Sequence, residues 1–124
     1  MAKGLGEKTW LIPDGFLPIH STGDFPSHEA ICVLNTGDAD AHLNICFYFE
    51  DRDPMTDFEF VCGSNRTQHI RLDRLKDKNG NGVPTGVPYA IKVCSDVEIV
   101  VQHSRMDTTQ PAMTLMTTMA HPIK

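Results

Sequence analysis

The 124-residue sequence lacks any long apolar run. No stretch approaches the ~20 consecutive apolar residues that a membrane helix requires, so no such helix is expected. Residues 1–6 carry one lysine and no apolar core, which is not the pattern of a secretory signal peptide. We therefore predict a cytoplasmic protein that forms a single domain, residues 1–124, around one hydrophobic core.

Basic residues are also in short supply. Eleven Lys and Arg stand against sixteen Asp and Glu, which gives a formal net charge of -5 and an isoelectric point near 5.6. Binding to the phosphate backbone of nucleic acids depends on clustered lysine and arginine. The composition therefore opposes nucleic-acid binding, although a local basic patch would still permit a contact with DNA.

Motifs for metal binding are missing. The four cysteines, at positions 32, 46, 62 and 94, contain no C-x-x-C pair, and the six histidines are scattered without a ligand spacing. In a reducing compartment, free thiols that act as small apolar side chains are the expected state. We predict no metal and no cofactor, and we keep a disulfide between Cys32 and Cys46 as the alternative to free thiols.

Catalytic motifs are missing as well. The chain contains no G-x-S-x-G, P-loop, G-x-G-x-x-G or H-E-x-x-H pattern. Ser104 follows His103 directly, but neighbouring residues of a strand point to opposite faces, which separates the two side chains. We therefore predict no catalytic residues, and a protein that binds rather than an enzyme.

What the sequence does contain is short apolar runs separated by turn residues. Nine Gly and eight Pro punctuate these runs, a pattern typical of a turn-rich β domain. The pattern predicts an all-β single domain, an antiparallel β-sandwich or jelly-roll-like barrel of about seven or eight short strands. The expected strands are 8–12, 27–35, 41–50, 58–62, 66–72, 88–95, 97–105 and 112–120. Pro13-Asp14-Gly15 is expected to end the first strand, and the tight connection at Ser95-Asp96 predicts that 88–95 and 97–105 form a hairpin. The last segment could be a helix by its length, but its threonine content favours a strand.

The second and third of these strands alternate apolar and polar residues, which predicts a hairpin. Pairing their apolar faces sets Val33 opposite Ile45 and Cys32 opposite Cys46. The same register places Glu29 on the core face. A buried carboxylate is costly unless it has a partner, so Glu29 is a candidate functional residue.

The strand 97–105 carries a face that changes character along its length. Val97, Ile99 and Val101 share this face with His103 and Arg105, because alternate residues of a strand point to the same side. Either the strand emerges into water at His103, or it walls a polar pocket at the rim of the core. A pocket of the second kind would suit a small ligand.

Four motifs in this chain resemble those of the sensory rhodopsin transducer family. They are Lys8-Thr9-Trp10-Leu11-Ile12-Pro13-Asp14-Gly15, the segment 27–38, Arg66-Thr67-Gln68-His69-Ile70-Arg71 and Val100-Val101-Gln102-His103-Ser104-Arg105-Met106-Asp107. The motifs occur in the same order as in the family, and the resemblance spans about residues 6–122.

The resemblance implies a β-sandwich subunit of a homotetramer. In the family's namesake role the protein is a partner of the cytoplasmic face of a membrane photoreceptor. A sugar-binding or other small-molecule-binding role, and DNA binding, are further implications. The loop 76–82 and the turn 63–66 depart from the cyanobacterial pattern, which puts photoreceptor docking and DNA contact in doubt.

The resemblance also implies a set of ligand-binding residues. We predict that Arg105 and His103 donate hydrogen bonds to ligand oxygens and that Glu29 accepts them from hydroxyl groups. Trp10 is either a core anchor or a platform for a sugar ring. The full set carried over is Trp10, His28, Glu29, His103, Arg105 and Asp107.

Overall fold

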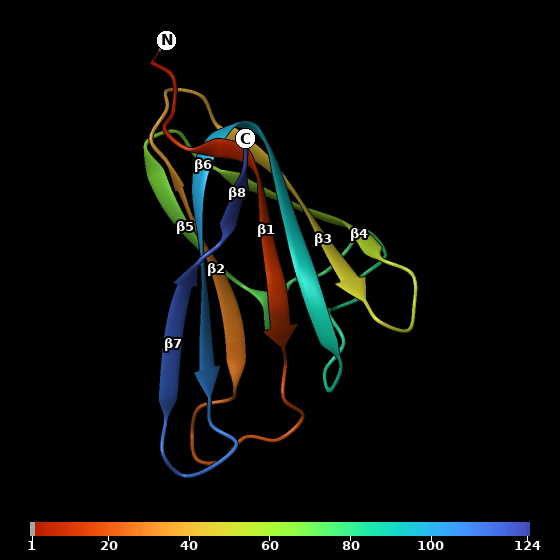
Figure 1. Cartoon of the computed structure of the whole chain (residues 1–124). Coiled ribbons are helices and arrows are strands. Elements are labelled where there is room, and N and C mark those ends of the chain that lie inside the picture. The colour runs from red at the N-terminus through yellow and green to blue at the C-terminus, as the bar shows by residue number, and fades with distance from the viewer. Residues whose placement is uncertain (1) are drawn as a thin grey trace.

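The computed structural model describes residues 2–124 and is built almost entirely of antiparallel strands (Figure 1). One short 3-10 helix, Leu72–Arg74, is the exception within this range. The prediction of an all-β sandwich is confirmed. The strands are β1 (Glu7–Phe16), β2 (His28–Asn35), β3 (Ala41–Phe49), β4 (Met55–Cys62), β5 (Arg66–Arg71), β6 (Pro88–Asp107), β7 (Thr114–Met119) and β8 (His121–Ile123).

The strands form two layers that share the long strand β6. The first half of β6 pairs with β1 and β3, which makes sheet A with the order β4-β3-β6-β1-β8. The second half pairs with β2 and β7, which makes sheet B with the order β5-β2-β6-β7. Figure 1 shows β6 bending over at one end of the sandwich, so that this end is closed and the opposite end carries the longer loops.

The prediction of two separate strands, 88–95 and 97–105, joined in a hairpin was wrong. The chain does change direction near Ser95 and Asp96, but the two halves of β6 pair with other strands in different sheets. The apolar alternation of β6 continues through the bend, because each half contributes its apolar side chains to the space between the sheets.

The predicted hairpin between the second and third strands was also wrong. β2 pairs with β5 and β6, whereas β3 pairs with β4 and β6, so the two strands lie in opposite sheets. Their apolar faces meet across the core instead of side by side. Cys32 and Cys46 therefore lie in different sheets, and all four cysteines of the described chain are free.

β1 continues to Phe16, beyond the predicted end at Ile12. The register of its pairing with β6 shifts between Ile12 and Gly15, which accommodates Pro13 without ending the strand. Gly15 is required there because a Cβ atom would lie 2.3 Å from the ring of Tyr89. This close approach brings the end of β1 against the core.

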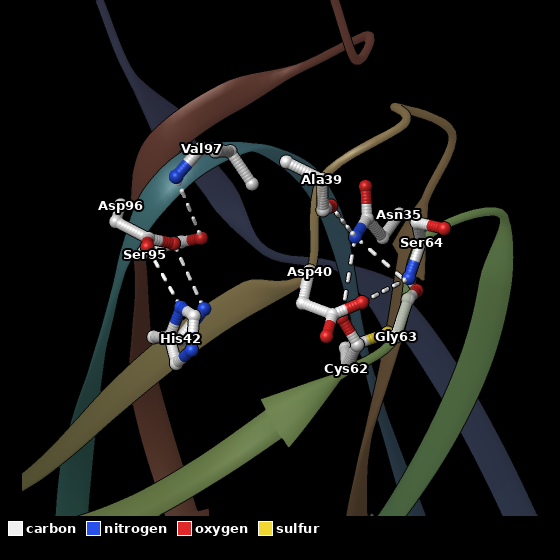
Figure 2. Close-up of polar contacts among 10 residues, drawn as sticks. All are labelled: Asn35, Ala39, Asp40, His42, Cys62, Gly63, Ser64, Ser95, Asp96 and Val97. Carbon is white, nitrogen blue, oxygen red and sulfur yellow. Dashed lines mark hydrogen bonds and ion pairs between the residues drawn. The ribbon is translucent and has the colours of Figure 1, made fainter.

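The core between the sheets is filled by side chains from both layers. Phe47 packs edge-to-face against Phe58 and Tyr89, with ring centroids 5.0 Å and 5.4 Å apart. At the closed end the buried amide of Asn35 donates to the backbone carbonyls of Ala39 (2.8 Å) and Cys62 (3.2 Å), as Figure 2 shows. These bonds tie the β2–β3 connection to the end of β4, so this polar group is structural.

Candidate functional site

Polar side chains meet at the open end of the sandwich, between the two sheets. Glu29 comes from β2, while Tyr89 lies near the start of β6 and His103 and Arg105 lie near its end. The backbone N–H of Phe16, at the end of β1, completes the group. We call these residues the Glu29 cluster.

The carboxylate of Glu29 is fully buried and accepts four hydrogen bonds. Its Oε1 accepts from the Tyr89 hydroxyl at 2.6 Å and from His103 Nε2 at 3.0 Å. Its Oε2 accepts from Arg105 Nε at 2.7 Å and from the Phe16 N–H at 2.8 Å. A carboxylate offers about four acceptor positions, so Glu29 has none left for a ligand.

The hydrogen bonds decide the charge of this carboxylate. Burial raises the pKa of Glu29, but hydrogen bonds from His103, Tyr89 and the Phe16 N–H outweigh burial and lower the pKa below its usual value. Burial and the charge of Glu29 raise the pKa of Tyr89. The cluster therefore holds an ionised carboxylate and a protonated phenol.

Arg105 is the member of the cluster that reaches toward solvent. Its side chain is 24% exposed, whereas the side chains of Glu29 and His103 are 0% and 3% exposed. Of its nitrogen atoms, only Nε donates a hydrogen bond to Glu29. Nη2 lies 3.9 Å from Oδ2 of Asp14, which is beyond hydrogen-bond range. The terminal N–H groups make no hydrogen bond to the described residues and are available to an incoming acceptor.

A depression of about 400 Å³ lies beside this cluster. Its lining residues include the acidic Asp14 and Glu50 and the aromatic Tyr48, Phe49 and Tyr89. A mostly apolar wall with a few polar groups is the usual makeup of a small-molecule site. Asp14, 85% exposed at its side chain, is the carboxylate nearest Arg105 that still has acceptor capacity.

Three of the six predicted site residues, Glu29, His103 and Arg105, come together in this cluster. Trp10 lies inside the fold, 5% exposed, and its indole N–H is bonded to the carbonyls of Glu7 (2.9 Å) and Ile99 (3.1 Å). These bonds make Trp10 an anchor between β1 and the bend of β6.

His28 and Asp107 lie outside the cluster. His28 is on the opposite face of β2 from Glu29, as predicted, and its Nδ1 is 3.1 Å from the carbonyl of Pro26. Asp107, at the end of β6, accepts from the backbone N–H and the hydroxyl of Thr109 at 2.8 Å and 2.6 Å. These contacts shape the loop that follows β6.

Tyr89, Asp14 and Gly15 belong to the site, but sequence reasoning missed them. Tyr89 alternates with Ile91 and Val93, which predicts a core residue, and Asp14-Gly15 follows a proline in a sequence that predicts a strand break. A buried tyrosine hydroxyl normally has a hydrogen-bond partner, and this requirement was the signal that could have linked Tyr89 to Glu29.

A second polar pair lies at the closed end. Both the backbone N–H and Nδ1 of His42 are 2.8 Å from the Asp96 carboxylate, as Figure 2 shows. His42 also borders a depression of about 720 Å³ along β3 and β4, which Asn44 and Glu59 line as well. Residues 2–124 contain no group of three or more His, Cys, Asp or Glu that could hold a metal ion.

No helix in the described part of the chain is long and apolar enough to cross a membrane. The family model described as Anabaena sensory rhodopsin transducer matches residues 5–122. No curated protein matches the chain.

Two solved structures are similar to this one. A Thermotoga maritima protein designated 1070 is 37% identical, with a TM-score of 0.85 and coverage of 95% of this chain and 96% of that chain. The structure described as Anabaena sensory rhodopsin transducer is 35% identical, with a TM-score of 0.72 and coverage of 80% of this chain and 87% of that chain.

Proposed function

Because this chain belongs to the Anabaena sensory rhodopsin transducer family, we propose that it is a cytoplasmic signalling protein that binds a sugar or related polyol. The main observation behind the proposed ligand is the position of the Arg105 guanidinium. Glu29 holds this group through Nε, and its terminal N–H groups lie at the open end of the sandwich. The aromatic depression of about 400 Å³, which is lined by Asp14, supports the same proposal.

In this proposal Arg105 donates hydrogen bonds to ligand oxygens, and Asp14 accepts them from ligand hydroxyls. Charge-assisted hydrogen bonds of this kind are about twice as strong as neutral ones. Glu29 has the different role of fixing the orientation of Arg105, because its own acceptor positions are filled. A guanidinium that is already oriented loses less conformational entropy when the ligand binds.

The proposed function involves no chemical step. The imidazole Nε2 of His103 is committed to Glu29, and its side chain is 3% exposed, which leaves it poorly placed to exchange protons with a substrate. Binding, rather than turnover, is the property that this arrangement supports.

The remaining parts of the proposal rest on family membership. The relative's description names it a sensory rhodopsin transducer, and we propose that this chain likewise relays a signal from a membrane photoreceptor by docking on its cytoplasmic face. Assembly as a homotetramer belongs to the same proposal. If the protein is an adaptor alone, it binds such a receptor without any small-molecule ligand.

A thermal-shift screen of neutral sugars, sugar acids and nucleotides tests the proposed ligand. A ligand at about 100 times its dissociation constant stabilises the folded state by about 2.7 kcal/mol, which is readily visible. Asp14→Asn should weaken a sugar hit about tenfold, equivalent to roughly 1.4 kcal/mol. Glu59→Gln, an exposed carboxylate on β4, is the matched control and should leave affinity unchanged. If no compound in the panel stabilises the protein, the adaptor role is the only proposed function that remains.

A further inference from the structure

The loop between the 3-10 helix and β6 contains two asparagine–glycine pairs, Asn79-Gly80 and Asn81-Gly82. The other asparagines of the chain, at positions 35, 44 and 65, are followed by Thr, Ile and Arg. Both asparagines of the loop are exposed to solvent. Because glycine has no side chain, its backbone nitrogen can approach the side-chain carbonyl of the preceding asparagine without a steric clash. These two side chains are therefore the asparagines most open to attack by the backbone.

The two glycines differ in how their backbone nitrogens are bonded. The N–H of Gly80 donates to the carbonyl of Asp77 at 3.0 Å. The N–H of Gly82 makes no hydrogen bond to residues 2–124, because the bond at its bridge with Lys76 runs from the Asp77 N–H to the carbonyl of Asn81 at 2.9 Å. A nitrogen that donates to a protein acceptor must give up that bond before it can react. Gly82 therefore has the more available nitrogen.

A lysine beside Gly82 adds to this difference. A Cβ atom on Gly82 would lie 3.0 Å from Nζ of Lys76, so the ammonium group is close to the Gly82 backbone. A positive charge at this distance stabilises the anion that forms when the glycine N–H loses its proton. A Cβ atom on Gly80 would have no atom within 4 Å beyond its chain neighbours. The cation therefore favours reaction at Gly82.

We propose that Asn81 is a site of spontaneous deamidation and reacts before the other asparagines of the folded protein. The nitrogen of Gly82 loses its proton and bonds to the side-chain carbonyl carbon of Asn81. The bond from that carbon to the side-chain nitrogen breaks, and this nitrogen leaves as ammonia after it takes up the proton. Water then opens the resulting succinimide ring at either carbonyl, which gives aspartate or isoaspartate at position 81.

The isoaspartate product changes the shape of the loop as well as its charge. Its main chain runs through the former side chain and is longer by one atom. The bond from the Asp77 N–H to the carbonyl at position 81, and the bridge between Lys76 and Gly82, depend on the ordinary spacing. The loop should therefore open and expose Lys76 and Lys78 to trypsin. Residues 76–82 contribute nothing to the Glu29 cluster, so this inference does not depend on the proposed ligand.

Peptide mapping by mass spectrometry tests the inference on protein that is incubated at mildly alkaline pH in water enriched in heavy oxygen. The product at position 81 should carry the heavy oxygen, because water opens the succinimide. Anion exchange should resolve a form with one more negative charge than the formal -5. In folded protein position 81 should react faster than position 79. In denaturant both glycine nitrogens are released from the fold, so the two positions should react at similar rates.

Variants separate the loop structure from the sequence alone. Gly82→Ala should slow the reaction at Asn81 about tenfold, because a methyl group obstructs the attacking nitrogen. The fold should tolerate this change, since the nearest atom to the new Cβ is the end of the flexible Lys76 side chain. Lys76→Gln should slow the reaction as well. Asn79→Gln is the matched control and should leave the rate at Asn81 unchanged. Circular dichroism establishes that each variant is folded.

Trypsin should cut incubated wild-type protein after Lys76 or Lys78 faster than fresh protein, and incubated Gly82→Ala should resist like fresh protein. Equal rates at positions 79 and 81 in the folded protein would overturn the inference. Earlier reaction at any other asparagine, or a product at position 81 without heavy oxygen, would overturn it too.

Discussion

Glu29 and Arg105 are direct partners in the β2–β6 pairing, and Arg105 Nε donates to Glu29 Oε2 at 2.7 Å. Their side chains point between the sheets, where the carboxylate is fully buried and the guanidinium is partly exposed. The pair therefore connects the core to the open end of the sandwich. Glu29 supplies a buried charge, and Arg105 is partly exposed to solvent.

Glu29→Gln should destabilise the protein strongly. An amide cannot replace a carboxylate that accepts four hydrogen bonds, and removal of one partner of a buried ion pair costs about 3–5 kcal/mol. We expect a loss near the lower end, roughly 3 kcal/mol, because Arg105 can rehydrate. Denaturant unfolding measures the loss. Glu59→Gln is the exposed control and should change stability by no more than about 0.5 kcal/mol.

The stability of the protein should depend on pH through Glu29. Its pKa is lower in the folded protein than the usual 4.5, so its contribution is fully present above pH 4.5 and is lost as the pH falls through the folded pKa. Other carboxylates with lowered pKa values contribute as well. The measurement is therefore the difference in unfolding free energy between wild type and Glu29→Gln as the pH is lowered. This difference should shrink in acid, and a constant difference would contradict an ionised Glu29.

Gly15→Ala should disturb the Glu29 cluster through strand β1. Its Cβ would lie 2.3 Å from the Tyr89 ring and 2.9 Å from Glu29 Oε1, so the strand or the ring must shift. Overpacking of this kind costs about 1–3 kcal/mol. Gly63→Ala is the matched control, since a Cβ there meets its nearest neighbour at 3.5 Å. Equal unfolding midpoints for the two variants would show that β1 does not need this close approach.

Thiol reactivity should follow burial. Cys62 is fully buried, and burial raises the pKa of its thiol, so it should be the slowest of the four to react with a thiol reagent under native conditions. Cys32 and Cys94 are partly exposed and should react sooner. Mass spectrometry after timed labelling gives the order, and unfolded protein should label at all four positions. Rapid labelling of Cys62 in folded protein would contradict its placement in the core.

Alternation along the chain was enough to predict which residues face the core, but not which strands pair. Glu29, His103 and Arg105 were identified because the side-chain period of two applies to each strand separately. The pairing of β2 with β3 was predicted wrongly because two strands with apolar faces can bury them in either of two ways. They can lie side by side in one sheet, or they can face each other from opposite sheets of a sandwich. The hydrogen bond from Tyr89 to Glu29 joins residues sixty positions apart, and the bend of β6 lies where its pairing passes from one sheet to the other; local patterns specify neither.

Trp10→Phe separates the two roles that the sequence left open for this residue. The substitution removes an indole N–H that is bonded to the carbonyls of Glu7 and Ile99, and it leaves part of the space unfilled. We expect a stability loss of roughly 2–3 kcal/mol from the lost bonds and volume. Trp10 is the only tryptophan, so unfolding must be followed by circular dichroism. Affinity for a sugar found in the screen should be unchanged, because Trp10 makes no hydrogen bond to the Glu29 cluster. A variant with wild-type stability and no sugar binding would instead place Trp10 in the ligand site.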